Sequence, residues 1–312
     1  MQLYPLRVSQ SSHEFDDLLD KVPRLQNRTA VTELSGGLTN RNLKISTASG
    51  DYVARISSNK SSLLAIDRRS EYENSKIAAG IGVGAPVFDY LPEFGLLVIG
   101  YIPGRTYSKL DVSSNLDRIA STCSLLHKAA PFTRDFDMFV IQESYQKLVM
   151  ESGFRFPNGY HQYAHHLSRM KAALAVLDEG KVPCNNDLLP ANFIDDGKKI
   201  WFIDYEYSGN NDACFELGNI WSEAKLPLSA LEELVTAYYG SSRPDKLARA
   251  WLFALLAKYG WTLWASIQSS VSDIDFDFWQ WGMEKFEDVE ESFASNNFEQ
   301  ALTQVTQKSL LI

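Results

Sequence analysis

Cysteine is scarce in this sequence. Only Cys123, Cys184 and Cys214 occur among 312 residues, and no two of them form a Cys-x-x-Cys pair. An odd and widely spaced set does not suit a disulfide framework, and it lacks the ligand spacing of a structural zinc site. The sequence therefore argues against both.

Long hydrophobic runs are also missing. The longest apolar stretch, residues 251–265, is interrupted by Lys258 and is shorter than the roughly 20 residues that a membrane-spanning helix needs. The first 20 residues mix Arg7, His13 and acidic side chains with single apolar residues, so they lack the apolar core of a signal peptide. We therefore expect no membrane insertion and a cytoplasmic protein.

Positive charge is in deficit. The chain has 30 Lys and Arg against 39 Asp and Glu, a formal net charge of -9. Such a surface repels phosphate backbones, so we expect no nucleic-acid partner. It can favour a cationic substrate, although salt limits this attraction to short range. The remaining composition, 45% hydrophobic and 22% charged, is that of a globular protein, and the length suits two domains or one two-lobed domain.

The N-terminal third has the pattern of a β-rich unit. Short β-prone or alternating runs are separated by glycine-containing turns, and an amphipathic helix is predicted at residues 67–79. The predicted strands are 29–34, 42–46, 52–56, 86–90 and 95–102. Pro103 and Gly104 then break the pattern.

Helix-period apolar residues dominate beyond that break. The predicted helices are 115–127, 139–150 and 162–177, and further helices follow from residue 215 to the end. Residues 182–204 differ, because two short strand-like pieces flank polar loops there. We predict an α+β fold with a β-rich N-terminal lobe at residues 1–102 and a mainly helical C-terminal lobe at residues 103–312. Ligand sites favour such junctions, so a nucleotide is expected between the lobes.

The polar loops of residues 182–204 contain Asp187, Asn192 and Asp204. Phosphoryl transfer needs a carboxylate that accepts the hydroxyl proton, oxygen ligands for magnesium, and a cation for the phosphates. Asp187 would be the catalytic base, and Asn192 and Asp204 would be the oxygen ligands of Mg²⁺. Taken singly, each is more simply a turn or capping residue. Their combination within strand-flanked loops favours phosphoryl transfer.

Residues 184–193 (CNNDLLPANF) and 201–207 (WFIDYEY) resemble the catalytic and metal loops of the choline/ethanolamine kinases, a branch of the aminoglycoside-phosphotransferase and protein-kinase-like superfamily. The resemblance runs from about residue 34 to about residue 281. It implies a protein-kinase-like two-lobed fold, ATP and Mg²⁺ as cofactors, and a small cationic alcohol as substrate. The implied reaction gives the phosphomonoester of choline or ethanolamine and ADP, within phospholipid precursor metabolism.

The same resemblance assigns the nucleotide contacts. Residues 35–40 (SGGLTN) match the nucleotide loop between the first two strands, and no Lys-Ser/Thr pair follows, so this is not a P-loop. Arg55 matches the phosphate-binding cation, Glu71 its acidic partner with Glu73 as second choice, and residues 99–102 the adenine-binding hinge. The expected contacts are Ser35, Gly36, Gly37, Thr39, Asn40, Arg55, Glu71, Gly100 and Ile102.

The resemblance places the substrate contacts in the C-terminal helices. A quaternary ammonium group cannot donate hydrogen bonds, so aromatic faces and carboxylates must hold it. The expected substrate residues are Glu206, Glu223, Trp261, Trp264 and Trp281, and Gln268 matches a family position without an assigned role. Tryptophans at helical spacing are more often core residues, which is the alternative interpretation.

Three positions depart from the family pattern. Asn185 stands where His is usual, Glu216 replaces an Asp that braces the catalytic loop, and Leu189 stands where some relatives have a polar residue near the substrate. Asn can donate and accept hydrogen bonds, so loop support can survive. The alternatives are therefore a kinase for another cationic alcohol, such as thiamine or an aminoglycoside, or a catalytically weakened relative that binds choline or nucleotide. A homodimer stays open as the assembly.

Overall fold

The computed structural model describes residues 14–34, 37–57 and 63–307. Its N-terminal part is built on a five-stranded antiparallel sheet with the strand order β1-β2-β3-β5-β4. The strands are β1 (Arg28–Leu34), β2 (Asn40–Thr47), β3 (Gly50–Ser57), β4 (Val87–Leu91) and β5 (Leu96–Gly100). This confirms the β-rich N-terminal lobe.

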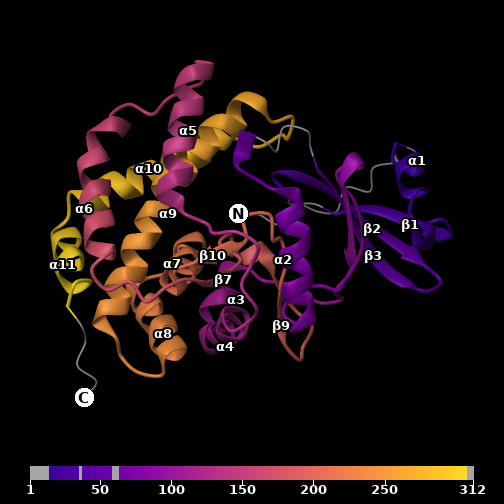
Figure 1. The fold of residues 1–312 in the computed structure, drawn as a ribbon, viewed down its shortest axis with the longest axis horizontal. Helices are drawn as coiled ribbons and strands as arrows, with labels where there is room; N and C mark the ends of the chain where they lie inside the picture. Colours follow the sequence, from indigo (N-terminus) through magenta and orange to yellow (C-terminus); the bar gives the residue numbers. More distant parts are fainter. Residues whose placement is uncertain (1–13, 35–36, 58–62, 308–312) are drawn as a thin grey trace.

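Helix α2 (Arg68–Gly80) lies between this sheet and the rest of the molecule (Figure 1). It begins where Asp67 accepts a hydrogen bond from the amide of Ser70, as an N-cap residue should. On the sheet itself, Ile45, Ala54 and Val98 are buried. They pack against the small helices α1 (Asp16–Leu19) and η1 (Pro23–Leu25), which close the other side of this core.

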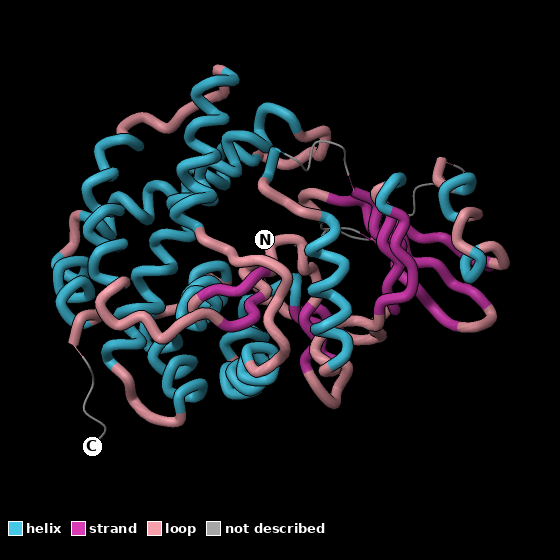
Figure 2. Tube along the Cα trace, viewed as in Figure 1, coloured by secondary structure: helices cyan, strands magenta, loops and turns pink. Residues whose placement is uncertain are grey.

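The C-terminal part is mainly helical, and the helices fill one side of Figure 2. Helix α9 (Pro244–Val271) lies at its centre and packs against α5, α7 and α10. Most residues of α9 are buried on all faces, which is typical of a core helix. The other helices are α3 (Lys109–Ser113), α4 (Leu116–His127), α5 (Met138–Ser152), α6 (Ala164–Leu174), α7 (Ala213–Glu223), α8 (Leu228–Tyr239), α10 (Phe278–Phe293) and α11 (Asn296–Gln304).

Short strands position the polar loops between these helices. One sheet pairs β7 (Val182–Cys184) with β10 (Gly209–Asn211), and the other has the order β6 (Arg105–Thr106), β8 (Phe193–Asp195), β9 (Ile200–Phe202). The predicted catalytic loop thus spans β7 to β8, and the predicted metal loop spans β9 to β10. The amide of Phe202 donates to the carbonyl of Val83, which ties β9 to the segment after α2.

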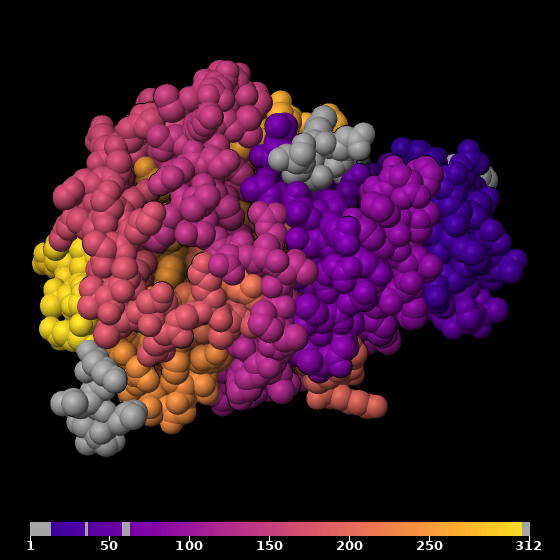
Figure 3. Space-filling model, viewed as in Figure 1, coloured from indigo at the N-terminus to yellow at the C-terminus, as the bar shows by residue number. Residues whose placement is uncertain are grey.

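The structure confirms the α+β, two-lobed class, and the two parts pack against each other in the space-filling view (Figure 3). The element ends differ in detail. The strand predicted at 95–102 ends at Gly100, and the helix predicted at 162–177 is the 3₁₀ helix η4 (Tyr160–Tyr163) followed by α6. Within the described residues, no helix combines the length and hydrophobicity needed to cross a membrane. The division at residue 102 falls between β5 and β6 and stays a prediction.

Candidate active site

The catalytic loop is folded around Asp187. Its backbone carbonyl accepts a hydrogen bond of 2.7 Å from Asn192 Nδ2 and one of 2.9 Å from the amide of Leu189. Since Asn192 uses its amide nitrogen in this way, its Oδ1 is the end left for a ligand. The loop therefore holds a carboxylate and an amide oxygen in one fixed turn.

The backbone is strained at two residues of this region. The backbone φ angle is 67° at Asn186 and 64° at Asp204. These values lie in the left-handed region, which residues other than glycine adopt uncommonly. Hydrogen bonds hold both in place, because Asn186 Nδ2 donates to the carbonyl of Tyr207 and Asn185 Nδ2 donates to the carbonyl of Asp204. Strain of this kind collects at functional sites.

Asn185 links the two loops, although His is usual at its position. Besides its bond to Asp204, its Nδ2 donates to the carbonyl of Ile203, and its Oδ1 accepts from the amide of Asp187. Asn185 thus holds both the catalytic loop and the metal loop, as expected if loop support survives the change from His.

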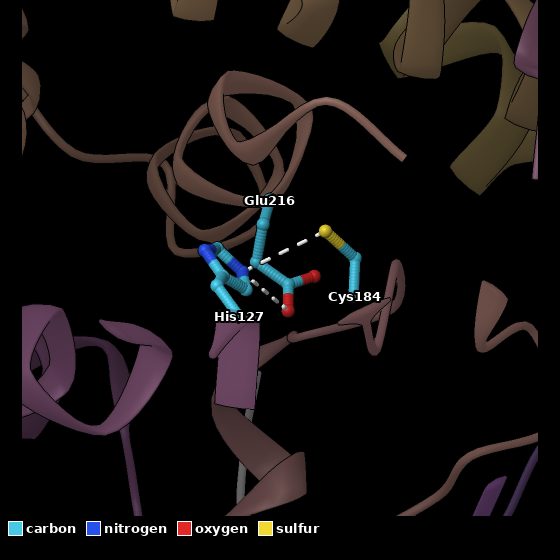
Figure 4. A group of neighbouring side chains, drawn as sticks. All are labelled: His127, Cys184 and Glu216. Atoms are coloured by element: carbon cyan, nitrogen blue, oxygen red, sulfur yellow. Dashed lines mark hydrogen bonds and ion pairs between the residues drawn. The ribbon is translucent and has the colours of Figure 1, made fainter. Parts of the chain in front are cut away.

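Glu216 braces the catalytic loop, as the resemblance implies for its position. Its two carboxylate oxygens accept hydrogen bonds from the amides of Asn185 at 2.9 Å and Asn186 at 2.7 Å. Beside it, His127 Nε2 lies 3.7 Å from Glu216 Oε1 and 3.6 Å from Cys184 Sγ (Figure 4). His127 Nδ1 is paired with the hydroxyl of Tyr238.

The three groups of Figure 4 could geometrically hold a metal ion, since their ligand atoms lie within 4.8 Å of one another. Hydrogen bonding already explains the arrangement, because Glu216 accepts two backbone amides and burial raises the pKa of the Cys184 thiol, which favours the neutral donor. We interpret them as a brace. Sequence reasoning missed this cluster because its members come from three distant segments with no characteristic spacing.

The charged cluster, defined as Arg55, Arg68, Glu71, Asp204 and Glu206, joins the two lobes. Arg55 Nε lies 2.8 Å from Glu71 Oε1, so the pair expected between β3 and α2 is present. Arg55 Nη2 also donates to Asp204 Oδ1 at 2.5 Å and to Glu206 Oε2 at 2.9 Å. Glu73, the second choice for the pair, lies instead 3.3 Å from Lys76.

Glu206 was expected to face the substrate, which stays a prediction, and the structure places its carboxylate in the charged cluster. Its carboxylate accepts hydrogen bonds from Thr39 Oγ1 at 2.6 Å and Asn40 Nδ2 at 2.8 Å, and from Arg55 and Arg68. Four N-terminal side chains therefore occupy it.

The nucleotide loop is described only in part. Ser35 and Gly36 lie outside the described residues. Gly37 is needed at its position, because a Cβ atom there would lie 2.5 Å from the carbonyl oxygen of Asn40. Thr39 and Asn40 were expected to contact nucleotide, and the structure places their side chains on Glu206.

Burial and charge shift the acidity of the site. Burial raises the pKa of Asp187 well above its usual value, and the neighbouring carboxylates of Asp204 and Glu206 add to this. Burial also opposes ionisation of Glu206, but the guanidinium groups of Arg55 and Arg68 outweigh it and lower the pKa of that carboxyl. Asp187 is thus the stronger proton acceptor of the two.

A cavity between the lobes adjoins the charged cluster. Its walls include apolar side chains of β5 and β9 as well as three charged side chains. The lining residues are Arg55, Glu71, Ser75, Ala85, Leu97, Ile99, Phe202, Ile203, Asp204 and Tyr205. Gly100 and Ile102, which are expected at the adenine site, follow the lining residue Ile99 in the chain. The side chain of Ile102 is buried. The cavity thus combines apolar and charged side chains at the lobe junction, where the nucleotide is expected.

The same region fits a magnesium ion. Asn192 has its Oδ1 available, and among the described residues the Asp204 carboxylate accepts a side-chain hydrogen bond only through Oδ1, from Arg55. Magnesium prefers such oxygen ligands and takes few of them from the protein.

The expected substrate tryptophans form an aromatic cluster, defined as Tyr207, Trp261, Trp264, Phe278 and Trp281. Trp264 Nε1 donates to the Tyr207 hydroxyl at 2.8 Å, and the ring centres of Trp264 and Trp281 lie 5.5 Å apart. Trp261 meets Tyr207 edge to face at 5.0 Å. Trp261 and Trp264 are only 4% and 5% exposed, so both rings are packed as core residues are.

Glu223 meets this cluster through a lysine that sequence reasoning missed. Lys285 Nζ lies 2.7 Å from Glu223 Oε1 and 4.2 Å from the centre of the Trp281 ring. Lys285 and Trp281 are four residues apart on α10, so they share one helix face, and this spacing was the available signal.

Arg68 was also missed, although it stands three residues before Glu71 on α2. Gln268 Nε2 donates to the carbonyl of Leu38, which joins α9 to the nucleotide loop.

Comparison with known proteins gives one family. The family model described as choline/ethanolamine kinase matches residues 31–234. Protein LicA of Haemophilus influenzae is 28% identical over 214 residues, which cover 65% of this chain and 61% of that protein. Ethanolamine kinase 2 of Rattus norvegicus is 33% identical over 141 residues, 38% of this chain and 37% of that protein. The chain therefore spans less than two thirds of the length of these curated relatives.

A solved structure agrees over nearly the whole chain. The choline/ethanolamine kinase family protein from Mesorhizobium loti superposes with a TM-score of 0.82 at 29% identity, covering 94% of this chain and 98% of that one. The likeness therefore includes both lobes.

Proposed function

Since this chain belongs to the choline/ethanolamine kinase family, we propose that it transfers the terminal phosphoryl group of ATP to the hydroxyl of choline or ethanolamine. The products are the phosphomonoester and ADP. The observation that carries the proposal is the single turn that holds Asp187 and Asn192 together, tied through Asn185 to Asp204. The proposal includes a cytoplasmic location, where ATP is present.

In this proposal Asp187 orients the hydroxyl and accepts its proton. Its raised pKa makes it a better base than an exposed aspartate. The hydrogen bonds from Leu189 and Asn192 to its carbonyl fix the backbone, so the carboxylate reaches the hydroxyl without a conformational search.

Asn192 and Asp204 would hold Mg²⁺, which when bound neutralises charge on the phosphates. Arg55 lies beside Asp204 and stays protonated in its carboxylate surroundings. Its guanidinium stabilises the charge that develops on the phosphoryl oxygens during transfer.

For the alcohol, Trp264, Trp281 and Glu223 are the proposed contacts of the cationic head group. The Lys285 ammonium already combines a carboxylate with an aromatic face, which is the pairing that recognises a substituted ammonium. Because Lys285 neutralises Glu223, the aromatic cluster has little surplus negative charge. This supports a singly charged alcohol over a polycationic aminoglycoside.

The test is a turnover assay of the purified protein with Mg-ATP and a panel of alcohols: choline, ethanolamine, thiamine and an aminoglycoside. We expect phosphorylated choline or ethanolamine and an equal amount of ADP. Turnover on thiamine or the aminoglycoside alone would refute the substrate assignment. Nucleotide binding without turnover on any alcohol would instead identify a non-catalytic relative.

A further inference from the structure

Arg68, the first residue of α2, is a second guanidinium in the charged cluster. Its side chain is 16% exposed. Nη1 carries both of its contacts, with Glu71 Oε2 at 2.7 Å and Glu206 Oε2 at 3.0 Å. Its Nε and Nη2 atoms are buried, and neither has a hydrogen-bond partner within the described structure.

These two nitrogens form one edge of the guanidinium plane. On that edge Nε–H and one Nη2–H point side by side, in the spacing that binds two oxygens of a phosphate or carboxylate. A buried donor without a partner is costly, and charged donors are the costliest. Such an edge calls for an anionic ligand.

Arg55 shows the opposite use of the same edge. Its Nη2 donates to Asp204 and Glu206, so protein carboxylates already occupy one of the two donors of that edge. Its Nε lies 2.8 Å from Glu71 Oε1 but, like the Nε of Arg68, has no hydrogen-bond partner within the described residues. Of the two guanidinium groups, Arg68 is therefore the one whose paired donors are available to a ligand.

The contacts of Nη1 fix the direction of the available edge. Glu71 is held by Arg55 from β3, and Glu206 is held by Thr39 and Asn40 from the nucleotide loop. The Nη1 of Arg68 is thus anchored on two carboxylates that also bind β3 and the nucleotide loop, and the Nε–Nη2 pair is the other edge of the same guanidinium. Two guanidiniums here face three carboxylates, so the cluster has no surplus positive charge, and phosphate binding requires Mg²⁺ as well.

We propose that the Nε–Nη2 edge of Arg68 binds phosphate oxygens of the nucleotide. Arg68 joins Arg55 as a phosphate-binding residue, and its Nη1 stays on Glu71 and Glu206 while the opposite edge holds the ligand. The inference rests on the proposed function, because it takes Mg-ATP as the phosphoryl donor.

The test compares Arg68→Lys and Arg68→Met with the wild type, using calorimetric titration of Mg-ADP in the absence of any alcohol. Lysine can keep a positive charge on Glu71 and Glu206 but has no planar pair of donors. We expect both variants to bind Mg-ADP about 10- to 100-fold more weakly, the loss of one or two charged hydrogen bonds. The KM for ATP should rise by a similar factor, and the KM for the alcohol should change much less.

Arg69→Met is the matched control, because Arg69 is the exposed neighbour on the same helix turn. It should bind Mg-ADP like the wild type. Thermal unfolding without ligand checks that each variant is folded, and Arg68→Lys should unfold close to the wild type.

Wild-type affinity for Mg-ADP in Arg68→Lys would overturn the inference. An equal rise of both KM values in Arg68→Lys would also overturn it, because that pattern indicates general damage to the site. A wild type that does not bind Mg-ADP overturns it together with the use of ATP. Failure of every alcohol as substrate, with Mg-ADP binding that still depends on Arg68, refutes the proposed reaction and supports the phosphate contact.

Discussion

The charged cluster and the aromatic cluster are built in opposite ways. The charged cluster takes side chains from β3, α2 and the loop after β9, and hydrogen bonds of 2.5 to 3.0 Å connect them across the lobe junction. The aromatic cluster comes mainly from the adjacent helices α9 and α10, whose rings meet edge to face inside the helical core. One is held by charge between separate elements, and the other by packing within one lobe.

This difference predicts different consequences of mutation. Removing one charge leaves buried charges of opposite sign without a partner, and this penalty reaches several kcal/mol. Removing one ring leaves a cavity and takes away a contact surface. We therefore expect the charged cluster and its catalytic loop to control rate and nucleotide use, and the aromatic cluster to control the affinity for the alcohol.

The largest expected effect is that of Asp187→Ala on turnover. Without the carboxylate, the hydroxyl loses its proton acceptor and its orientation, so kcat should fall about 10²- to 10⁴-fold. Steady-state kinetics with saturating Mg-ATP measures this, and thermal unfolding should show an intact fold, since the loop bonds use the backbone of Asp187. A near-normal kcat would show that another group accepts the proton.

Arg55→Met should destabilise the whole protein. Glu71, Asp204 and Glu206 all contact this guanidinium, whose side chain is only 8% exposed. We expect the free energy of unfolding to fall by about 3–5 kcal/mol, measured by urea denaturation. Arg55→Lys keeps the charge and should lose less. A loss below about 1 kcal/mol, the size typical of an exposed pair, would mean that the cluster does not hold the lobes together.

Trp281→Ala should affect the KM for the alcohol and the KM for ATP differently. Its ring faces the ammonium of Lys285 and neighbours Trp264, so its loss should raise the KM for choline about tenfold and leave the KM for ATP nearly unchanged. Trp251→Ala on α9 is a comparison variant outside the aromatic cluster. If Trp281→Ala raises the KM for choline and the KM for ATP equally, the aromatic cluster does not control the affinity for the alcohol separately.

Asn185→His should have the smallest effect. The imidazole can replace part of the bonding of Asn185 to the metal loop, so the free energy of unfolding should change by less than about 1.5 kcal/mol. Asn185→Ala removes the donor and the acceptor and should be more harmful to kcat. If Asn185→His abolishes turnover while Asn185→Ala does not, the loop support assigned to this side chain is wrong.

Local motifs predicted the parts of the site that lie close in sequence. Asp187 and Asn192 share one loop, and the Arg55–Glu71 pair follows from a strand and the helix after it, so both could be anticipated. The two-lobed fold followed from strand alternation giving way to helical periodicity near Pro103. The roles of these residues, and of Gly100, Ile102 and the tryptophans, stay predictions.

Contacts between residues far apart in the chain could not be predicted from the sequence. Glu206 pairs with Thr39 and Asn40 more than 160 positions away, and nothing in the pattern says that the lobes meet there. The cluster of His127, Cys184 and Glu216 has the same origin. Such contacts depend on how helices and strands are placed in three dimensions, and a single sequence contains no periodic signal for that placement.

A hydrogen bond from Gln268 connects α9 in the C-terminal lobe to the nucleotide loop in the N-terminal lobe. The side chain of Gln268 bonds to the carbonyl of Leu38 at 2.9 Å, and it lies one helical turn after Trp264. If nucleotide binding moves residues 37–40, this hydrogen bond transmits the movement to α9, which carries Trp261 and Trp264. By thermodynamic linkage, nucleotide and alcohol must then change each other's dissociation constants by one common factor, whichever of them arrives first.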